Sequence, residues 1–367
     1  MSATLATADA PEDPFGEPSC DVSIVIPTWN GRHLLETCLA SLDAAEGATD
    51  RVERIVFDNG SVDDTVDWLV RTYPRVRILR SPRNLGFAEA CNRAVAAARA
   101  AQVCLLNNDV RVAPDLLGEL LRARAATGAV CVGARVLTAA GSEVEFDGGT
   151  LNFYGHGAPY RYGVAAAAVE DEREPRPSLF ACGAAMLVDR DVFLEVGGFD
   201  ESYFAYYEDV DLGWRLWALG HGCVVAPAAR VYHRGQGSEA ALGTHGRTRL
   251  LERNALLTIY KNYEPGTGDR VFACALALLN ERARLDESRA AACREGLLSA
   301  LAALPVAERA REELARRRVR GDDEIAPLFV DPWRPVVGGD EYAAIQADLA
   351  RQYGIDRCFS GVGEELG

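Results

Sequence analysis

Short apolar runs alternate with longer helical patterns in the first part of the chain, and this alternation constrains the fold more than any other feature. Five runs fit buried strands, at residues 22–26, 54–57, 76–79, 103–106 and 129–132. Four amphipathic patterns between them fit helices, at residues 34–42, 63–73, 86–101 and 114–125. Because strands that alternate with helices are joined by right-handed crossovers, the sequence predicts a doubly wound, mostly parallel α/β sheet over about residues 20–135.

The alternation stops after about residue 135. Residues 136–180 carry Gly, Tyr, Pro and acidic residues with little periodicity, which favours a loop or a β-ribbon. Further elements are expected at 184–188 (strand), 209–219 (helix), 223–226 (strand), 248–320 (helical) and near 342–353 (helix). The predicted organisation is a disordered tail over 1–19, an α/β domain over 20–247 and a helical C-terminal extension over 248–367.

Charge and cysteine spacing exclude several classes of protein. The 367 residues include 39 Lys and Arg against 54 Asp and Glu, a formal net charge of −15, which argues against a general nucleic-acid binder. The ten cysteines form no C-x-x-C pair, so zinc ribbons and thioredoxin-type redox motifs have no support. The first twenty residues have neither a basic region nor an apolar stretch, which is unlike a signal peptide. We therefore expect a cytoplasmic protein.

One apolar stretch leaves a membrane contact open. Residues 271–279 (VFACALALL) lie between Arg270 and Glu281, and a second cationic cluster follows at 316–318. The stretch fits a core helix, and it also fits an interfacial helix attracted to anionic lipid. A peripheral position on the inner face of the plasma membrane is the alternative that this stretch supports.

The loops after the predicted strands are the first candidates for a site, because ligands bind at the carboxyl ends of strands in an open parallel sheet. Residues 27–32 (PTWNGR) are not a G-x-G-x-x-G turn, which disfavours a dinucleotide site. Asp58 ends the second strand and either belongs to a turn or accepts hydrogen bonds from a nucleobase. Asn107, Asn108 and Asp109 follow the fourth strand, where the carboxylate either holds a divalent cation beside phosphates or caps the next helix.

Two further candidates lie in the second half of the chain. Glu208, Asp209 and Asp211 put three carboxylates at the start of a predicted helix, where they complement the helix dipole or supply a general base. His233 follows the last predicted strand, and a lone histidine there is more often structural than a metal ligand.

Seven segments in a fixed order carry more information than any one of them. They are PTWNGR, DNGSVDDT, RNLGFAEACNRA, LLNNDV, ACGAAMLVDRDVF, GGFDESYFAYYEDVDLGWRL and YHRGQGS. Together, over about residues 22–262, they resemble the glycosyltransferase family 2 proteins with a GT-A fold, in particular the rhamnosyl- and galactofuranosyltransferase-like members that build bacterial surface polysaccharides. The resemblance implies a GT-A-like α/β fold and an inverting, metal-dependent hexosyltransferase, which moves a hexose from a nucleoside-diphosphate sugar to an acceptor hydroxyl.

The resemblance also implies a role for individual residues. The nucleotide-sugar-binding positions that it implies are Pro27, Thr28, Asn30, Asp58, Asn84, Asn107, Asn108, Asp109, Gly183 and Glu208. Asn107 and Asp109 match the first and last places of the family's DxD metal motif. Because the first place is Asn and lacks a negative charge, Asp109 is the stronger candidate for the metal ligand. His233 matches a histidine that completes the metal site in some members, and Asp209 matches the catalytic base.

The implied cofactor is Mg²⁺ or Mn²⁺, and the implied partners are the sugar donor and a glycan, lipid-linked or small-molecule acceptor, with no nucleic acid. Two rival functions are a nucleotidyltransferase and a non-catalytic nucleotide-sugar-binding protein. The first needs a loop rich in Gly, Arg and Lys after strand one, where only Arg32 is found. The presence of Asp109, Asp209 and His233 argues against the second.

Overall fold

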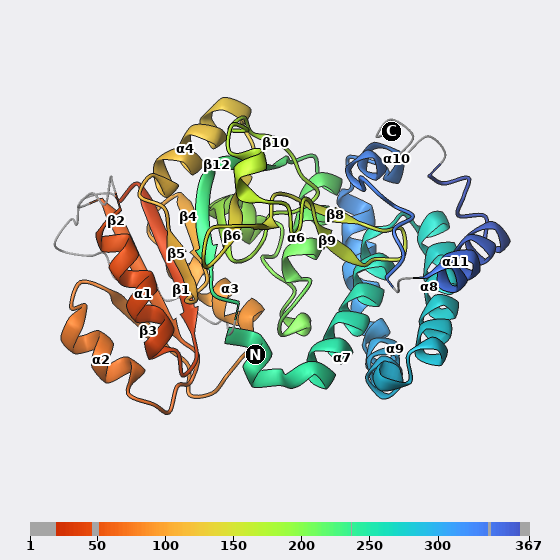
Figure 1. Cartoon of the computed structure of the whole chain (residues 1–367), viewed down its shortest axis with the longest axis horizontal. Coiled ribbons are helices and arrows are strands. Elements are labelled where there is room, and N and C mark those ends of the chain that lie inside the picture. Colours follow the sequence, from red (N-terminus) through yellow and green to blue (C-terminus); the bar gives the residue numbers. More distant parts are fainter. Residues whose placement is uncertain (1–19, 46–50, 236, 337–338, 360–367) are drawn as a thin grey trace, which may run out of the picture.

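The computed structural model describes residues 20–45, 51–235, 237–336 and 339–359, so the predicted tail over 1–19 lies outside the described residues. A central sheet with helices on both faces forms one side of the molecule, and a layer of helices forms the other (Figure 1). The strands are β1 (Val22–Thr28), β2 (Val52–Asp58), β3 (Arg77–Arg80), β4 (Gln102–Leu106), β5 (Val110–Val112), β6 (Cys131–Thr138), β7 (Val144–Phe146), β8 (Gly149–Leu151), β9 (Gly157–Pro159), β10 (Arg176–Pro177), β11 (Ala185–Asp189) and β12 (Cys223–His233). The α-helices are α1 (Arg32–Asp43), α2 (Thr65–Thr72), α3 (Phe87–Ala97), α4 (Leu116–Thr127), α5 (Arg190–Glu195), α6 (Glu208–Ala218), α7 (Gly237–Asn262), α8 (Pro265–Leu285), α9 (Glu287–Arg317), α10 (Asp322–Ile325) and α11 (Asp340–Gln352).

The sheet is mostly parallel, as predicted, with the strand order β10-β12-β6-β11-β4-β1-β2-β3. The first four strands run parallel to one another where they pair, whereas β11 runs antiparallel to both β4 and β6. The direction of β11 was not predicted. It follows from the path of the segment before β11, which returns to the carboxyl edge of β4. There the backbone N–H of Asn107 donates to the carbonyl of Ala184 at 2.9 Å. Since β11 starts at that edge, it has to run back along β4.

Two strands are longer than the sequence predicts. The runs 129–132 and 223–226 belong to β6 and β12, which continue to Thr138 and His233. Buried Arg135 interrupts the apolar pattern of β6, and its guanidinium makes two 3.0 Å hydrogen bonds to the buried carboxylate of Asp147 in the following ribbon. A bulge after Ala226 interrupts the pattern of β12. The second half of β12 then pairs with β5, which brings His233 opposite Val110.

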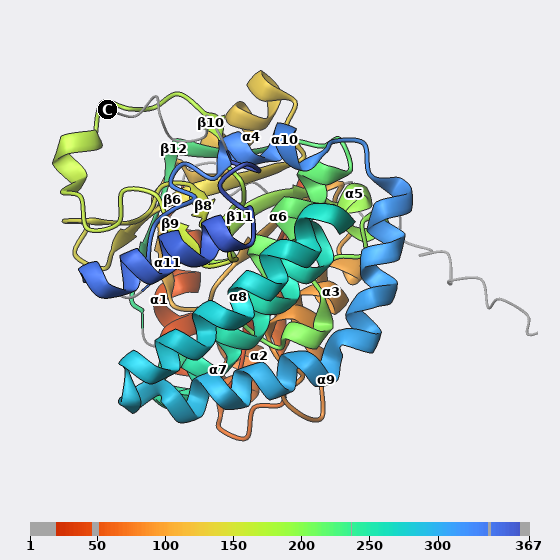
Figure 2. The same cartoon turned by 90° about the vertical axis from the view of Figure 1, so that its right-hand side faces the viewer.

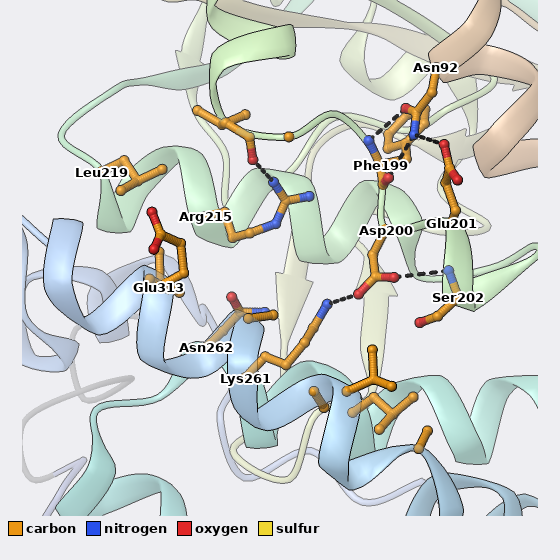
Figure 3. A pocket seen from close by; sticks show the side chains of 18 of the residues that line it. Asn92, Phe199, Asp200, Glu201, Ser202, Arg215, Leu219, Lys261, Asn262 and Glu313 are labelled. Carbon is orange, nitrogen blue, oxygen red and sulfur yellow. Dashed lines mark hydrogen bonds and ion pairs between the residues drawn. The ribbon is translucent and has the colours of Figure 1, made fainter. Parts of the chain in front are cut away.

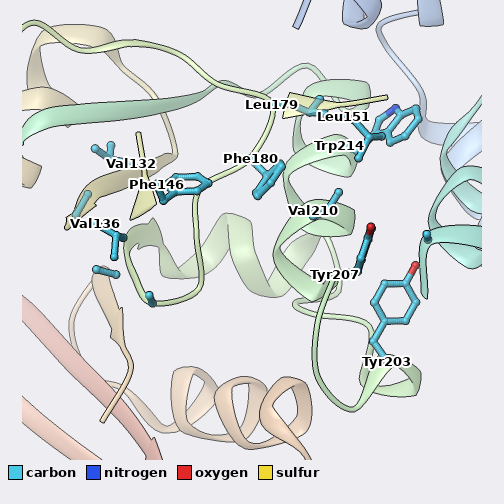
Figure 4. Packing of buried hydrophobic residues seen from close by; sticks show 14 of the residues in the cluster. Val132, Val136, Phe146, Leu151, Leu179, Phe180, Tyr203, Tyr207, Val210 and Trp214 are labelled. Atoms are coloured by element: carbon cyan, nitrogen blue, oxygen red, sulfur yellow. The ribbon is translucent and has the colours of Figure 1, made fainter. Parts of the chain in front are cut away.

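One hydrophobic cluster joins the sheet to the helical layer. It contains Val136 of β6, Phe180 of the segment between β10 and β11, and Trp214 of α6 (Figure 4). It continues into α7 and α8. Tyr263, directly after α7, stacks edge-on against Trp214 with ring centroids 4.7 Å apart. The predicted boundary between residues 247 and 248 falls inside α7, so the extension shares a core with the α/β part.

The helical layer consists mainly of α7, α8 and α9, which pack side by side (Figure 2). The apolar stretch 271–279 lies in α8, and Val271, Cys274 and Leu278 are fully buried, so this stretch is a core helix. Among the described helices, α9 alone has the length and composition for a membrane span. A third of its apolar window (33%) is buried, and a single helix of this kind is weak evidence.

Candidate active site

The loops at the carboxyl ends of β1, β2 and β4 surround a cavity of about 640 Å³, which we call the β1 cavity. Seven of the predicted nucleotide-sugar-binding residues line it: Pro27, Thr28, Asn30, Asn84, Asn107, Asn108 and Asp109. Amide side chains fix its walls. Asn108 donates to the hydroxyl of Thr28 at 2.8 Å, and the oxygen of Asn30 accepts from the backbone N–H of Val62 at 2.9 Å. The residues that the sequence analysis grouped in these loops therefore lie around one cavity.

Asp58 has a different position from these residues. Its side chain is fully buried, it accepts from the N–H of Ser61 at 3.1 Å, and it pairs with Arg80 at 3.2 Å. Asn59, the next residue, lines the β1 cavity and bonds to Asn84 and to the carbonyl of Gly86. In this structure Asp58 supports the wall of the cavity, and its contact with a nucleobase stays a prediction.

A second cavity, of about 570 Å³, lies against the start of α6, and we call it the α6 cavity. Glu208, Asp209 and Gly183 line it together with Glu145 and His233. The two cavities adjoin, since they share the lining residues Phe87, Asn107, Asp109 and Ala205. Asp109 therefore lies at the border between the β1 cavity and the α6 cavity.

The carboxylate of Asp209 is held by backbone N–H groups. Gly183 donates to one oxygen at 3.0 Å and Val210 donates to the other at 2.8 Å. Burial raises the pKa of Asp209, and these two hydrogen bonds oppose the rise. No side chain pairs with Asp209 among the described contacts, so its remaining lone pairs face the cavity.

Glu208 is more deeply buried, with 7% of the residue exposed, and no described residue bonds to its Oε2. Burial, together with the neighbouring charge of Asp209, raises the pKa of Glu208 to about 8. Ionisation of one member therefore disfavours ionisation of the other. Asp209 is the better stabilised anion of the two, because its carboxylate accepts two backbone hydrogen bonds.

The loop before α6 has a strained backbone. Phe204, Tyr206 and Tyr207 have φ values of 64°, 68° and 74°, in the left-handed region that such residues rarely occupy. The buried amide of Asn254 in α7 holds this loop, with its Nδ2 at 3.2, 3.0 and 2.8 Å from the carbonyls of Tyr203, Ala205 and Tyr206. The sequence contained no signal for this role of Asn254, because it depends on how α7 packs.

Asp109 and His233 meet at the junction of the two cavities. The pairing of β5 with β12 brings His233 Nε2 to 3.3 Å from Asp109 Oδ2, and His233 Nδ1 lies 2.7 Å from Glu145 Oε2. Burial lowers the pKa of His233, but the hydrogen bonds and charges of Asp109 and Glu145 outweigh this and raise it to about 9. Glu145, on the ribbon strand β7, was not predicted.

The residue types at this junction fit a divalent cation. Two carboxylates and an imidazole converge there, and oxygen and nitrogen ligands of this kind suit Mg²⁺ or Mn²⁺. As they stand, the imidazole of His233 lies between the carboxylates of Asp109 and Glu145, which raise its pKa, so a cation bound there would compete with a proton on the ring. No group of three or more such side chains already arranged around a metal position occurs among the described residues.

A third cavity, of about 680 Å³, lies on the other side of α6, between α6, α7 and α9 (Figure 3). Several of its charged groups pair with neighbouring side chains. Lys261 lies 2.8 Å from the buried carboxylate of Asp211 and also pairs with Asp200, and Arg215 donates to Asp211 at 2.8 Å. This cluster ties α6 to α7, and it lies away from the carboxyl edge of the sheet.

Comparisons with known proteins agree with this geometry. The sequence profile of glycosyl transferase family 2 matches residues 23–197. The chain is 35% identical over 238 residues, 57% of its length and 75% of the relative's, to the N-acetylglucosaminyl-diphospho-decaprenol L-rhamnosyltransferase of Mycobacterium tuberculosis. It is 28% identical over 235 residues to the pre-mycofactocin glycosyltransferase of the same species, covering 62% of this chain and 46% of that one.

Solved structures show the same fold at low identity. GalNAc-T7, solved with UDP, GalNAc and Mn²⁺, superposes with a TM-score of 0.55 at 17% identity, over 70% of this chain and 51% of that one. Staphylococcus aureus TarS 1–349 superposes with a TM-score of 0.52 at 14% identity, over 93% and 92%. The fold is thus that of the GT-A glycosyltransferases. The chain belongs to glycosyltransferase family 2.

The cluster around Asp211 predicts a stability effect. Replacing Asp211→Asn leaves Lys261 and Arg215 short of a buried counter-charge, so the free energy of unfolding should fall by about 3 kcal/mol. Burial by itself raises the pKa of Asp211, but the two cations outweigh burial and hold the pKa well below its usual range. The stability that Asp211 adds is therefore present at neutral pH and lost in acid, so the difference between the two proteins should shrink below about pH 4. Urea unfolding at several pH values measures the difference in free energy of unfolding between wild type and Asp211→Asn, with exposed Asp191→Asn as the control. Equal stability of wild type and Asp211→Asn at pH 7 would contradict the account.

The amide that holds the strained loop predicts an effect on turnover. Asn254→Ala should lower turnover by at least about tenfold, because the loop that positions Asp209 loses its support. Thr258→Val is the matched control, since Thr258 is also buried in α7 and bonds to the hydroxyl of Tyr203 at 2.9 Å rather than to the loop backbone. Both variants should lower the melting temperature, and only Asn254→Ala should lower turnover strongly. Equal turnover losses would show that the effect is one of stability alone.

Proposed function

We propose that this glycosyltransferase moves a hexose from a nucleoside-diphosphate sugar to an acceptor hydroxyl and inverts the anomeric centre. The observation that carries the proposal is that the β1 cavity and the α6 cavity adjoin at Asp109, with Asp209 in the second of them. A nucleotide in the β1 cavity directs its diphosphate past Asp109 and its sugar toward Asp209. Bacterial cell-wall, surface-polysaccharide or glycoconjugate synthesis is the proposed setting, in the cytoplasm or on the inner face of the plasma membrane, and the names of the relatives support it.

The β1 cavity offers hydrogen-bonding groups suited to a nucleotide. Thr28, Asn30, Asn84 and Asn108 present hydroxyl and amide groups, and Pro27 lines the cavity beside them. At the α6 end, Gly183 leaves room for the sugar. A Cβ at Gly183 would lie 3.3 Å from the ring of Phe87 and 3.8 Å from Asp209 Oδ2, inside the space next to the proposed base.

Asp109 and His233 would hold the metal ion, with Asn107 beside them. Bound there, Mg²⁺ or Mn²⁺ neutralises the negative charge that develops on the leaving diphosphate. The solved GT-A neighbour that contains UDP and Mn²⁺ supports a divalent cation in this fold.

Asp209 would act as the general base. As the acceptor oxygen forms its bond to the anomeric carbon, the bond from that carbon to the diphosphate breaks, and the hydroxyl proton passes to Asp209. Attack from the face opposite the diphosphate inverts the centre. The N-terminus of α6 and the N–H groups of Gly183 and Val210 favour the ionised form of Asp209, whereas no described residue bonds to Glu208 Oε2.

The two rival functions are less well supported. Membership of the family favours glycosyl transfer over nucleotidyl transfer. A non-catalytic binder would bind the donor and release no nucleotide, so a nucleotide-release assay separates it from the proposed enzyme.

The role of Asp209 predicts the behaviour of one variant. Asp209→Asn keeps the shape and removes the base, so turnover should fall by at least about a hundredfold while donor affinity changes by no more than a few-fold. Nucleotide release under saturating donor and acceptor measures turnover, and calorimetry measures donor affinity. Asp191→Asn, an exposed carboxylate outside the cavity lining, is the control. If Asp209→Asn retained more than about a tenth of wild-type turnover, another group would be the base.

The role of Asp109 predicts a loss of metal dependence. In Asp109→Ala, Mn²⁺ should no longer increase the affinity for a nucleoside diphosphate, and His233→Ala should weaken this increase less. The measurement is nucleotide affinity with Mn²⁺ and with EDTA, and Glu143→Gln, two residues before Glu145, is the control. An undiminished Mn²⁺ effect in Asp109→Ala would rule out Asp109 as the ligand.

A further inference from the structure

The turn between β8 and β9 brings a histidine to the wall of the α6 cavity. His156 lies in this turn and lines the α6 cavity, with 14% of its side chain exposed. Asn152 fixes the turn, because its Oδ1 accepts from the N–H of His156 at 2.8 Å and its Nδ2 donates to the carbonyl of Arg334 at 3.0 Å. The imidazole also packs edge-on against the ring of Tyr154, with centroids 5.4 Å apart. The imidazole is therefore held in place by the protein itself.

The same turn contacts the first turn of α6, which carries Asp209. The N–H of Gly157, the residue after His156, donates to the hydroxyl of Tyr207 at 3.1 Å, and Tyr207 immediately precedes α6. A Cβ at Gly157 would lie 3.3 Å from a methyl group of Val210, so the ribbon and the helix are in close contact there. His156 and Asp209 thus lie on contacting segments of the wall of one cavity.

The guanidinium of Arg282 determines which ring nitrogen of His156 carries the proton. It lies 3.1 Å from His156 Nε2, and because a guanidinium has only hydrogen-bond donors, Nε2 has to accept. The buried carboxylate of Glu252 pairs with Arg282, so the charge of this guanidinium is balanced. Burial and the charge of Arg282 hold the pKa of His156 well below its usual value, so the ring is neutral at pH 7. A neutral imidazole that accepts at Nε2 carries its proton on Nδ1.

Nδ1 is the polar atom of this ring that is left for a ligand. None of the residues that the structure describes bonds to His156 Nδ1, whereas both ring nitrogens of His233, the other histidine of the lining, lie beside carboxylates. A fixed N–H donor in a cavity wall binds an oxygen atom of a ligand and sets the orientation of that ligand. Because the ring is uncharged, it suits an uncharged oxygen such as a sugar hydroxyl better than a phosphate.

We propose that His156 binds the acceptor: its Nδ1–H donates to an oxygen of the sugar that carries the attacking hydroxyl, and it thereby holds that hydroxyl at Asp209. The proposal rests on the proposed function of the α6 cavity and names its acceptor class, a sugar with a second oxygen close to the reactive hydroxyl. With Asp209 alone the acceptor is free to turn about one hydrogen bond. A second contact, at His156, fixes the direction of the attacking oxygen.

The first measurement determines the position of the proton on the ring. The chain has five histidines, so ¹⁵N NMR of the imidazole nitrogens in histidine-labelled protein gives few signals, and the variant His156→Asn identifies those of His156. At pH 7 His156 should show a protonated Nδ1 and an unprotonated Nε2. A proton on Nε2, or on both nitrogens, would overturn the proposal, because the ring would then not accept from Arg282 and donate from Nδ1.

The second measurement tests whether a sugar reaches this ring. The probes are the methyl glycosides of glucose, galactose, mannose and N-acetylglucosamine, titrated in the presence of UDP, GDP or dTDP, each with Mn²⁺. At least one glycoside should shift the Nδ1 signal of His156. The same shift with UDP-glucose, GDP-mannose or dTDP-glucose added alone would assign the ring to the donor and overturn the proposal, as would the absence of a shift with all four glycosides.

Two variants separate binding from stability. His156→Leu and His156→Asn both remove the nitrogen that accepts from Arg282, so both should lower the melting temperature to a similar extent. The Asn amide can place an N–H near the position of Nδ1, whereas Leu has no donor. Ligand-observed NMR should show glycoside affinity about fivefold weaker in His156→Leu, the loss expected for one hydrogen bond between uncharged groups, and closer to wild type in His156→Asn. Wild-type affinity in His156→Leu, or equal losses in the two variants, would overturn the proposal.

Nucleotide affinity separates a failure of this proposal from a failure of the proposed function. Wild type should bind a nucleoside diphosphate more tightly with Mn²⁺ than with EDTA, because that binding depends on the β1 cavity and on Asp109. If it does so and no glycoside reaches His156, the acceptor proposal alone fails. If wild type binds none of UDP, GDP and dTDP, the proposed function fails and the acceptor proposal fails with it.

Discussion

The buried carboxylate of Asp211 is the contact on which the rest of the site depends. Within α6 it pairs with Arg215, and it joins α6 to α7 through Lys261 and Asn262. Once α6 is fixed, its first turn places Asp209 at the cavity, and once α7 is fixed, Asn254 can hold the strained loop in front of it. Burying a charge of this kind is costly unless it is fully paired, and the two cations and one amide around Asp211 meet that requirement.

The sequence predicted the parts of the site that depend on the parallel sheet. Residues after β1 and β4 meet because the carboxyl ends of parallel strands share one edge, so strand patterning alone was enough to group Thr28, Asn30 and Asp109. The α6 base followed from the family resemblance and the helix start. The geometry now shows that the N–H groups of Gly183 and Val210 hold its carboxylate.

The sequence could not predict contacts that depend on packing between distant segments. Glu145 reaches His233 because the ribbon after β6 folds back on the sheet, and that ribbon has no periodic pattern. Asn254 lies in α7, where the sequence predicts helix but not which neighbour each face of the helix meets. The position of Asp58 beneath the cavity wall follows from its pair with Arg80, for which strand patterning gives no sign.

The central claim is that two adjoining cavities hold the diphosphate at Asp109 and the transferred sugar at Asp209. The most direct measurement is a crystal structure of the protein grown with Mn²⁺ and nucleoside diphosphates, with anomalous scattering recorded at the manganese edge. The account predicts an anomalous peak next to the carboxylate of Asp109, with the nucleoside in the β1 cavity between the loops after β1 and β2. A nucleotide in the third cavity between α6 and α9, or manganese bound away from Asp109, would contradict it.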